Sequence, residues 1–330
     1  MAEAPPDPPT VSVVLPVRNR RDLLGRALDA LDLQTFTDFE VVVVDDGSTD
    51  GSGELAAART VAGRAVLVVP AAGDGAVAAR TLGVRRATGR ILAFTDSDCE
   101  PSPQWLDEAV RAVDAGADLV NGRTVPARPP LPLERSMESG EEGLYPTCNL
   151  VVRRSSFDAV GGFDHDAGGR WGFRPDRRSK GDGFGEDTIL AWELIRSGAT
   201  ARYVPNAIVR HSVFPPDAVD TLSRTARVAA FPAMLRDIPE LRPTMLRWGW
   251  QLGARTRLPL YALLVAALTR RWPLIAAAAA WWVGLRLHEL RRFPISWRRR
   301  AAVVPVELGI DVITAGALAV GSVRSRHLVL

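Results

Sequence analysis

The chain has 330 residues, of which 47% are hydrophobic and 24% are charged. This apolar content is enough to build a sizeable core, which excludes a disordered chain, a collagen and a small disulfide-stapled protein. The net charge is only +3 and arginine supplies nearly all of the basic residues, so nothing in the composition calls for a nucleic-acid partner. Two cysteines far apart in the sequence, Cys99 and Cys148, are too few for a metal knuckle and favour a reducing compartment.

Residues 1–10 contain no basic segment and no apolar run, so we expect a short flexible N-terminus rather than a secretory signal. After them, short β-branched runs alternate with helical patterns, which is typical of βαβ units around a mostly parallel, buried sheet. The first helix is expected over residues 22–33. The predicted strands cover residues 11–17, 39–44, 65–70, 91–95 and 201–204, the last extending toward Val209.

An acidic pair, Asp45 and Asp46, follows the second predicted strand. Such a pair commonly forms a turn or caps a helix. In an open α/β sheet, however, ligands bind beyond the carboxyl ends of the strands, where a carboxylate can accept hydrogen bonds from a ribose or a base. The turn after the first strand reads PVRNR over residues 16–20, so the glycine-rich loops of dehydrogenases and P-loop NTPases are absent there.

A second acidic turn, with Asp96 and Asp98, follows the strand over residues 91–95. Two carboxylates one residue apart can converge on one hard cation, Mg²⁺ or Mn²⁺, although an ordinary turn would use the same residues. His211 follows the last predicted strand. We expect it to be either a structural histidine or a further donor to the metal and diphosphate.

A third acidic pair, Glu186 and Asp187, opens an amphipathic helix that includes residues 189–195. The glycines within residues 181–185 predict a mobile loop that orders over a substrate. A carboxylate at the start of a helix can simply complement the helix dipole. It can also act as the general base that takes a proton from an attacking hydroxyl.

The C-terminal third changes character. The composition shifts after about Val213, and residues 228–330 lose the β-rich runs and become rich in Ala, Leu, Trp and Arg. We expect a helical C-terminal region over residues 226–330, with apolar stretches over residues 258–268, 272–285 and 301–323. The first two stretches are shorter than the roughly 20 residues of a membrane span. Tryptophans at their ends and an arginine-rich loop over residues 286–300 nevertheless favour membrane contact, with a soluble helical subdomain as the alternative.

The third apolar stretch contains two acidic residues. Glu307 and Asp311 lie one helical turn apart, so a helix here has a polar stripe. We therefore expect it to lie on a membrane or to pack against partners rather than to face lipid on all sides.

Taken together and in order, these motifs resemble the inverting glycosyltransferases of family 2, which have the GT-A fold. The resemblance covers residues 10–215, with further similarity to the acceptor-side segment of the family at residues 147–154 and 160–164. The motifs that carry it are VSVVLPVRN at 11–19, VVVVDDGSTDGS at 41–52, TDSD at 95–98 and GEDTILAWEL at 185–194. The resemblance implies an α/β sandwich with a mostly parallel central sheet over residues 11–225, followed by the apolar helices.

The resemblance also implies a site for a nucleotide-diphosphate sugar. It assigns nucleotide-sugar binding to Pro16, Arg18, Asp45, Asp46, Arg80 and Asp96. It assigns the divalent cation, Mn²⁺ or Mg²⁺, to the DXD turn, with Asp98 as the more direct ligand and Asp96 beside it, and we add His211 as a further donor. It assigns catalysis to Asp187 as general base, with Glu186 alongside. Thr81 departs from the family, which more often has Asn after this arginine.

A QxxRW-type motif is absent from the rest of the sequence, which implies transfer of a single sugar rather than polymer synthesis. The apolar C-terminal third suggests a lipid-linked or cell-envelope acceptor, at the cell membrane with the catalytic domain on the cytoplasmic side. Two alternatives stay open: a non-catalytic membrane-surface scaffold with this fold, and a sugar-phosphate nucleotidyltransferase. The latter would need a glycine-rich basic loop after the first strand, where this chain has PVRNR.

Overall fold

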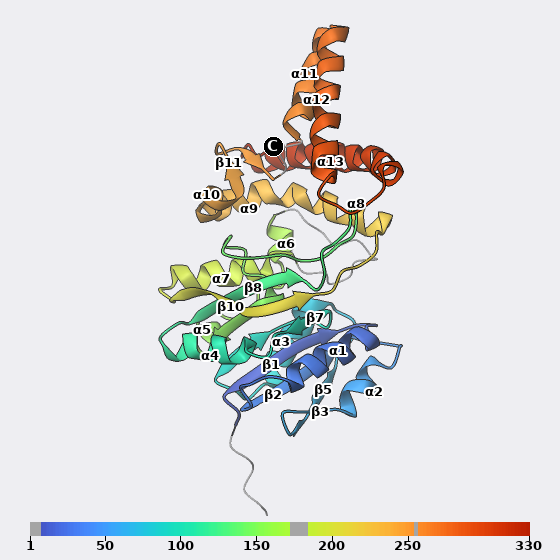
Figure 1. Ribbon diagram of the computed structural model, residues 1–330. Coiled ribbons are helices and arrows are strands. Elements are labelled where there is room, and N and C mark those ends of the chain that lie inside the picture. The colour runs from blue at the N-terminus through green and yellow to red at the C-terminus, as the bar shows by residue number, and fades with distance from the viewer. Residues whose placement is uncertain (1–7, 172–183, 254–256) are drawn as a thin grey trace, which may run out of the picture. The chain divides into compact units, whose positions relative to one another are not determined.

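The β-branched runs of the N-terminal half form one large sheet in the computed structural model, which describes residues 8–171, 184–253 and 257–330. Within these residues the sheet has eight strands, in the spatial order β5-β2-β1-β6-β9-β8-β10-β7 (Figure 1). Their bounds are β1 (Val11–Val17), β2 (Phe39–Asp45), β5 (Leu67–Pro70), β6 (Ile91–Phe94), β7 (Cys99–Pro101), β8 (Leu119–Pro126), β9 (Leu150–Arg153) and β10 (Ala201–His211). A small hairpin, β3 (Thr60–Val61) and β4 (Arg64–Ala65), stands apart.

The sheet is mostly parallel, as the sequence predicts. β5, β2, β1 and β6 pair in parallel, and so do β8 and β10. The exceptions among the described strands are β9, which is antiparallel to β6 and β8, and β7, which is antiparallel to β10. Strands β7, β8 and β9 are not among the predicted ones.

Side chains alternate along each strand, so the buried strands present apolar side chains on both faces of the sheet. Helices cover both faces. Val13 and Leu15 of β1 pack on one side with α1 and α4, whereas Val14 packs on the other side with α3, α5 and α7. The bounds in this part of the chain are α1 (Arg21–Asp32), α2 (Ser52–Ala57), α3 (Ala76–Arg86), α4 (Trp105–Asp114), the 3₁₀ turn η1 (Thr147–Asn149), α5 (Arg154–Ala159), α6 (Ala167–Arg170) and α7 (Glu186–Arg196).

Parallel pairing brings the sequence motifs to one edge of the sheet. Strand β1 leads to Arg18 and β2 leads to Asp46. Strand β6 leads to Asp96, and β10 ends at His211. Since these four strands run in the same direction, their carboxyl ends share the edge at which open α/β sheets bind ligands.

The chain divides into two compact units. The first, Met1–Arg128, Ser136–Arg170 and Arg174–Val213, contains the sheet. The second comprises Pro129–Arg135, Trp171–Phe173 and Phe214–Leu330. The expected domain boundary at residue 225 lies inside α8, a helix of the second unit.

Helices dominate the second unit. They are α8 (Ala218–Arg227), η2 (Val228–Ala230), α9 (Phe231–Asp237), η3 (Pro239–Leu241), α10 (Arg242–Met245), α11 (Arg257–Thr269), α12 (Trp272–Leu290) and α13 (Trp297–Ser325), with a short ladder of β11 (Leu246–Arg247) and β12 (Gln251–Leu252). Leu260, Trp282 and Ala315, one from each of the last three helices, form a small core. In the described part of the chain, α13 is long and apolar enough to cross a membrane, which supports membrane association only weakly.

Candidate active site

Two loops at the carboxyl ends of β1 and β2 are tied together through Asn19. Its side-chain oxygen accepts a hydrogen bond from the Thr49 N–H at 2.7 Å, and its own N–H donates to the Ser48 hydroxyl at 3.0 Å. Asn19 has φ 51°, a left-handed conformation that asparagine tolerates better than most residues. The neighbouring Arg18 remains exposed, so its guanidinium is available to a ligand at this edge.

The three other residues expected at the nucleoside differ in their surroundings. Asp46 is buried and accepts hydrogen bonds from the Gly73 and Gly75 N–H groups at 3.0 and 2.9 Å, so it fixes the loop before α3. Asp45 is the last residue of β2, where one oxygen accepts from the Ser48 N–H at 2.9 Å. Pro16 is half-buried within β1.

Arg80 joins two of the acidic motifs. Its buried guanidinium lies 2.7 Å from Asp96 Oδ1 and 3.3 Å from Glu186 Oε1. Arg80 comes from α3, Asp96 follows β6 and Glu186 begins α7, so one cation holds three elements together. A buried charge is stable only when it is paired in this way.

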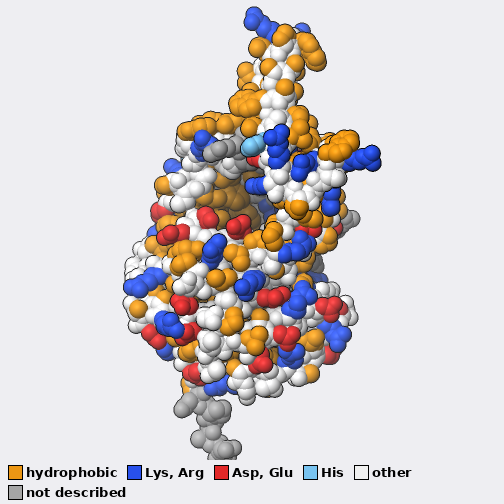
Figure 2. Space-filling model, in the orientation of Figure 1, with side chains coloured by type: hydrophobic (Ala, Val, Ile, Leu, Met, Phe, Trp, Pro, Cys, Tyr) orange, Lys and Arg blue, Asp and Glu red, His pale blue; other side chains and the backbone are white. Residues whose placement is uncertain are grey.

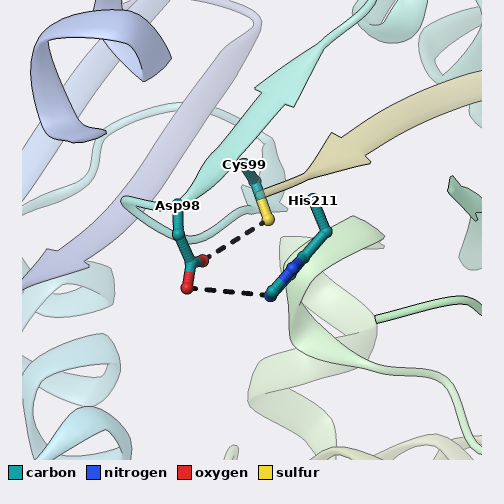
Figure 3. A group of neighbouring side chains, drawn as sticks. All are labelled: Asp98, Cys99 and His211. Atoms are coloured by element: carbon teal, nitrogen blue, oxygen red, sulfur yellow. Dashed lines mark hydrogen bonds and ion pairs between the residues drawn. The ribbon is translucent and has the colours of Figure 1, made fainter. Parts of the chain in front are cut away.

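Asp98, Cys99 and His211 form a compact group at the carboxyl end of the sheet (Figure 3). One possible ligand atom from each lies within 4.8 Å of the others, and His211 Nε2 is 3.6 Å from Asp98 Oδ2. Carboxylate oxygen and imidazole nitrogen both suit Mn²⁺, so this pair fits a divalent cation. Asp96 is not part of the group, since it faces Arg80.

Cys99 is the member of this group that the sequence did not suggest. A hydrogen bond with Cys148, burial and the negative charge of Asp98 raise the pKa of the Cys99 thiol well above its usual value. The protonated thiol points at Asp98 Oδ1 at 3.7 Å as a weak donor. We therefore assign Cys99 to orienting the carboxylate, because a metal ligand would have to be a thiolate.

The ring of His211 is oriented by backbone groups. Its Nδ1 lies 2.8 Å from the Ser212 carbonyl oxygen. A proton on Nδ1 donates to that carbonyl and leaves the lone pair of Nε2 directed toward Asp98. Metal-binding histidines commonly have this arrangement. A longer contact, 3.3 Å from the Met137 N–H to Nδ1, would need the other tautomer.

Arg20 is a second residue at this site that the sequence analysis did not single out. Its guanidinium forms an ion pair with Asp98, and its backbone N–H donates to the Ser52 hydroxyl at 3.2 Å. The guanidinium thus provides the positive charge at Asp98 in the structure. The signal was present in the PVRNR turn, but only the fold brings that turn to the carboxylate.

Asp187 lies at the start of α7, next to Glu186. Its two oxygens accept hydrogen bonds from the Thr188 N–H at 2.7 Å and the Thr147 N–H at 3.2 Å. Burial, followed by the negative charge of Glu186, raises the pKa of Asp187 to about 7. A carboxyl group with such a pKa can exchange a proton near neutral pH.

The segment just before Thr147 is anchored to the same helix. Thr188 donates its hydroxyl to the Leu144 carbonyl at 2.7 Å, and Trp192 donates its indole N–H to the Gly143 carbonyl at 3.0 Å. These bonds hold Thr147 against Asp187. The glycines expected to form a mobile loop lie outside the described residues, except Gly185, which has φ 76° at the start of α7.

Residues 12–163 match the family model described as glycosyl transferase family 2. The chain is similar to glycosyltransferase AglE of Haloferax volcanii, with 34% identity over 170 residues, which is 47% of this chain and 56% of that protein. It is also similar to the pre-mycofactocin glycosyltransferase of Mycobacterium tuberculosis, with 31% identity over 63% of this chain and 44% of that protein. The chain spans about half the length of these two curated relatives.

A solved structure with a similar fold is the mannosyltransferase PcManGT from Pyrobaculum calidifontis, in complex with GDP-Man and Mn²⁺. The TM-score is 0.55 at 21% identity, and the match covers 97% of this chain and 87% of that one. This likeness confirms the predicted fold class, an α/β sandwich of the GT-A type followed by apolar helices.

Proposed function

We propose that the chain transfers one sugar from a nucleotide-diphosphate sugar to an acceptor hydroxyl, with inversion and with the help of a divalent cation. The match of residues 12–163 to the model of glycosyl transferase family 2 supports this proposal. The observation that carries this proposal is the convergence of three groups at one sheet edge. Asp98 and His211 offer a cation site, Arg80 links two acidic motifs, and Asp187 has a pKa of about 7.

The donor side follows from the two loops tied by Asn19. The exposed Arg18 and the half-buried Pro16 would contact the nucleoside, with Asp45 and Asp46 shaping the wall behind it. Asp98 and His211 would hold the cation, which supplies positive charge beside the departing diphosphate when it is bound. The relative PcManGT was solved with GDP-Man and Mn²⁺, which supports a donor and a metal of this class.

The proton of the acceptor would go to Asp187. Glu186 is engaged in its ion pair with Arg80, so Asp187 is the carboxylate of the pair left to act as general base. Asp96 shares Arg80 and would keep its guanidinium fixed beside the donor. General-base assistance is worth roughly 10²–10⁴ in rate. Attack on the sugar carbon from the side opposite the diphosphate inverts the anomeric centre.

We place the reaction at the cytoplasmic face of a membrane, with a lipid-linked or cell-envelope acceptor. The support is the apolar C-terminal part of the chain, including α13 and tryptophans with exposed rings such as Trp272 and Trp297. A cytoplasmic catalytic unit would also have access to nucleotide sugars.

Calorimetric binding tests the donor site first. UDP, GDP and dTDP are titrated into the full-length protein, with and without Mn²⁺, and into the Asp98→Ala variant. We expect one nucleotide to bind in a Mn²⁺-dependent manner and the variant to lose at least tenfold in affinity. The exposed Asp158→Ala serves as the matched control. If folded protein binds none of the nucleotides, the transferase proposal is wrong and a non-catalytic scaffold becomes the better account.

Asp187→Asn tests the general base separately. Donor affinity should stay within about twofold of the wild type, because Asp187 is placed toward the acceptor. Transfer of labelled sugar into membrane extracts should fall by roughly 10²-fold or more. Transfer at the wild-type rate would refute the role of Asp187 while leaving the donor site intact.

A further inference from the structure

Helices α11 and α12 form a hairpin in the second unit, with Arg270 and Arg271 at the turn (Figure 1). We call residues 263–281 the distal hairpin. Ala266 and Ala278 are its buried residues, small side chains of the kind that allow two helices to approach closely. Its exposed large hydrophobic residues are Leu264, Val265, Leu268, Trp272, Leu274 and Trp281.

The distal hairpin has apolar side chains at every position except the turn residues 269–271, and Figure 2 shows apolar side chains along the face that it draws. Leu268 is 84% exposed and Trp272 is 73% exposed. A water-soluble helix presents polar residues on its outer face, whereas a helix that is apolar on every side belongs in a core or in lipid. In the hairpin, polar side chains occur at the turn instead. The exposed apolar surface of the hairpin is therefore not covered by protein in the described part of the chain.

The base of the hairpin, in contrast, is fixed to α13 by a polar cluster. Arg286 of α12 lies 2.7 Å from Asp311 and 3.4 Å from Glu307, both on α13. The indole N–H of Trp282 donates to Asp311 at 3.0 Å. The hairpin thus has a rigid attachment and a free apolar end.

Helix α13 has the length of a span but packs against other helices of the second unit. It packs along α8, η2 and α9, and Gly321 meets the backbone of Ala229 so closely that a Cβ would not fit. Helix α8 carries the charged residues Asp220 and Arg224, which are paired with each other at 3.7 Å. If α13 crossed a bilayer, these charges would enter the hydrocarbon, which is costly. The exposed apolar residues of α13 suit a helix that lies along the bilayer surface.

Basic residues lie at both ends of the apolar length of α12. Arg270 and Arg271 precede it, and the exposed Arg291 and Arg292 follow it. From Trp272 to Leu285 the helix rises about 20 Å. The side chains of Arg270 and Arg271 are long and add to this helix length, so that the total approaches the ~30 Å thickness of a hydrocarbon core. The basic residues at both ends of α12 can therefore contact the phosphate groups of lipid headgroups.

From this arrangement we propose that the α11–α12 hairpin inserts into an anionic phospholipid bilayer as a re-entrant element. Arg270 and Arg271 reach the headgroups of the far leaflet, while α13 stays at the near surface. Both chain termini then lie on the same side of the membrane. The inference deepens the membrane location proposed above, but it does not require sugar transfer.

Site-specific fluorescence tests insertion. An environment-sensitive dye is attached to Leu268→Cys or, as a control, to Leu33→Cys, a residue of the first unit that is 68% exposed. The native Cys99 and Cys148 are buried, so labelling of the unmodified protein gives the background. With phosphatidylcholine vesicles containing phosphatidylglycerol, the label at position 268 should shift to the blue and be quenched by brominated acyl chains. An unshifted label at 268 would overturn the proposal, and so would an equal shift at 33.

Charge substitution tests affinity. The double variant Leu264→Glu/Leu268→Glu should lose at least tenfold in vesicle co-sedimentation relative to Leu33→Glu, without nucleotide sugar present. Unchanged circular dichroism and nucleotide affinity show that the variant is folded. Wild-type-like sedimentation would refute the hairpin as the anchor. A vesicle-independent dimer that dissociates in the variant would identify a second copy as the partner instead.

Protease protection tests topology. Epitope tags at the two ends of the vesicle-bound chain should be digested together by external protease. Protection of the C-terminal tag alone would mean that α13 crosses the bilayer, and the re-entrant assignment would then be wrong.

Discussion

The buried carboxyl group of Asp187 lowers the stability of the folded protein near neutral pH, where it is proposed to act as the general base. Its pKa is about 7 in the folded protein, against 3.8 for an ordinary aspartate. At pH above 7 the carboxyl group is ionised in both the folded and the unfolded chain, so the folded state bears the full cost of the buried charge. Below pH 4 it is protonated in both states and the cost disappears. Stability contributed by this group is therefore lost as the pH rises from 4 to 7.

Asp187→Asn should consequently raise the free energy of unfolding at pH 8. The shift in pKa corresponds to roughly 4 kcal/mol, of which we expect about 2 kcal/mol to be recovered, because Asn also loses one charge-assisted hydrogen bond. Urea unfolding with a chelator present measures this. The gain should shrink at pH 5, and the exposed Asp158→Asn should show neither effect. A gain that does not depend on pH would contradict the account.

A second prediction at the residue scale concerns Arg20 and the affinity for Mn²⁺. Its guanidinium is paired with Asp98, so it competes with any cation for that carboxylate. Arg20→Gln should therefore bind Mn²⁺ more tightly, by about fivefold, when no nucleotide is present. Titration calorimetry with Mn²⁺ alone checks this. Arg26→Gln is the matched control, since Arg26 pairs at 3.2 Å with Glu100 on the surface. Weaker Mn²⁺ binding by the Arg20 variant would show that the guanidinium supports the site.

At the scale of elements, most of the strands that were predicted correctly are buried. Three of them, β1, β2 and β6, are apolar runs of four or more residues that are buried almost throughout. Strands β5 and β10 were also predicted, although both are partly exposed. Strand β7 has three residues with the sequence CEP, and no period can be read from so short a segment. The sequence also suggested which strand ends carry acidic residues. It could not show that Cys99 and Arg20 would meet Asp98, because those contacts depend on tertiary pairing.

The position of α3 sets the position of Arg80. Gly83 lies one turn after Arg80, and a Cβ there would be 2.6 Å from Val14 and 2.9 Å from Val44 side-chain atoms. Gly83→Ala must push the helix away from the sheet. We expect a loss of about 1–3 kcal/mol in unfolding free energy and a several-fold loss of nucleotide affinity, because the guanidinium moves with the helix.

Gly25→Ala in α1 is the control for that change. A Cβ at Gly25 meets Leu55 at 3.8 Å, an ordinary contact. Replacing a helical glycine then stabilises by about 0.5–1 kcal/mol. Equal behaviour of the two variants in urea unfolding would mean that α3 does not depend on its close approach to the sheet.

At the scale of the whole molecule, the two units divide the proposed tasks. The residues assigned to donor, cation and proton transfer all belong to the first unit, and the apolar hairpin belongs to the second. The first unit also contains the sheet and its large buried clusters, so its core does not draw on α8 to α13. The composition shifts after about Val213, next to Phe214, where the last segment of the second unit begins. The predicted domain boundary at residue 225 falls later, inside α8.

A fragment of residues 1–213 should therefore fold and retain Mn²⁺-dependent nucleotide binding within about fivefold of the full chain. It should lose vesicle binding completely, since the hairpin is missing. Residues 129–135 belong to the second unit, where Arg135 pairs with Asp220 at 2.8 Å, so this segment loses its partner in the fragment. Circular dichroism establishes folding, and calorimetry and co-sedimentation measure the two activities. A folded fragment that binds no nucleotide, beside a full-length chain that does, would show that the donor site needs the second unit.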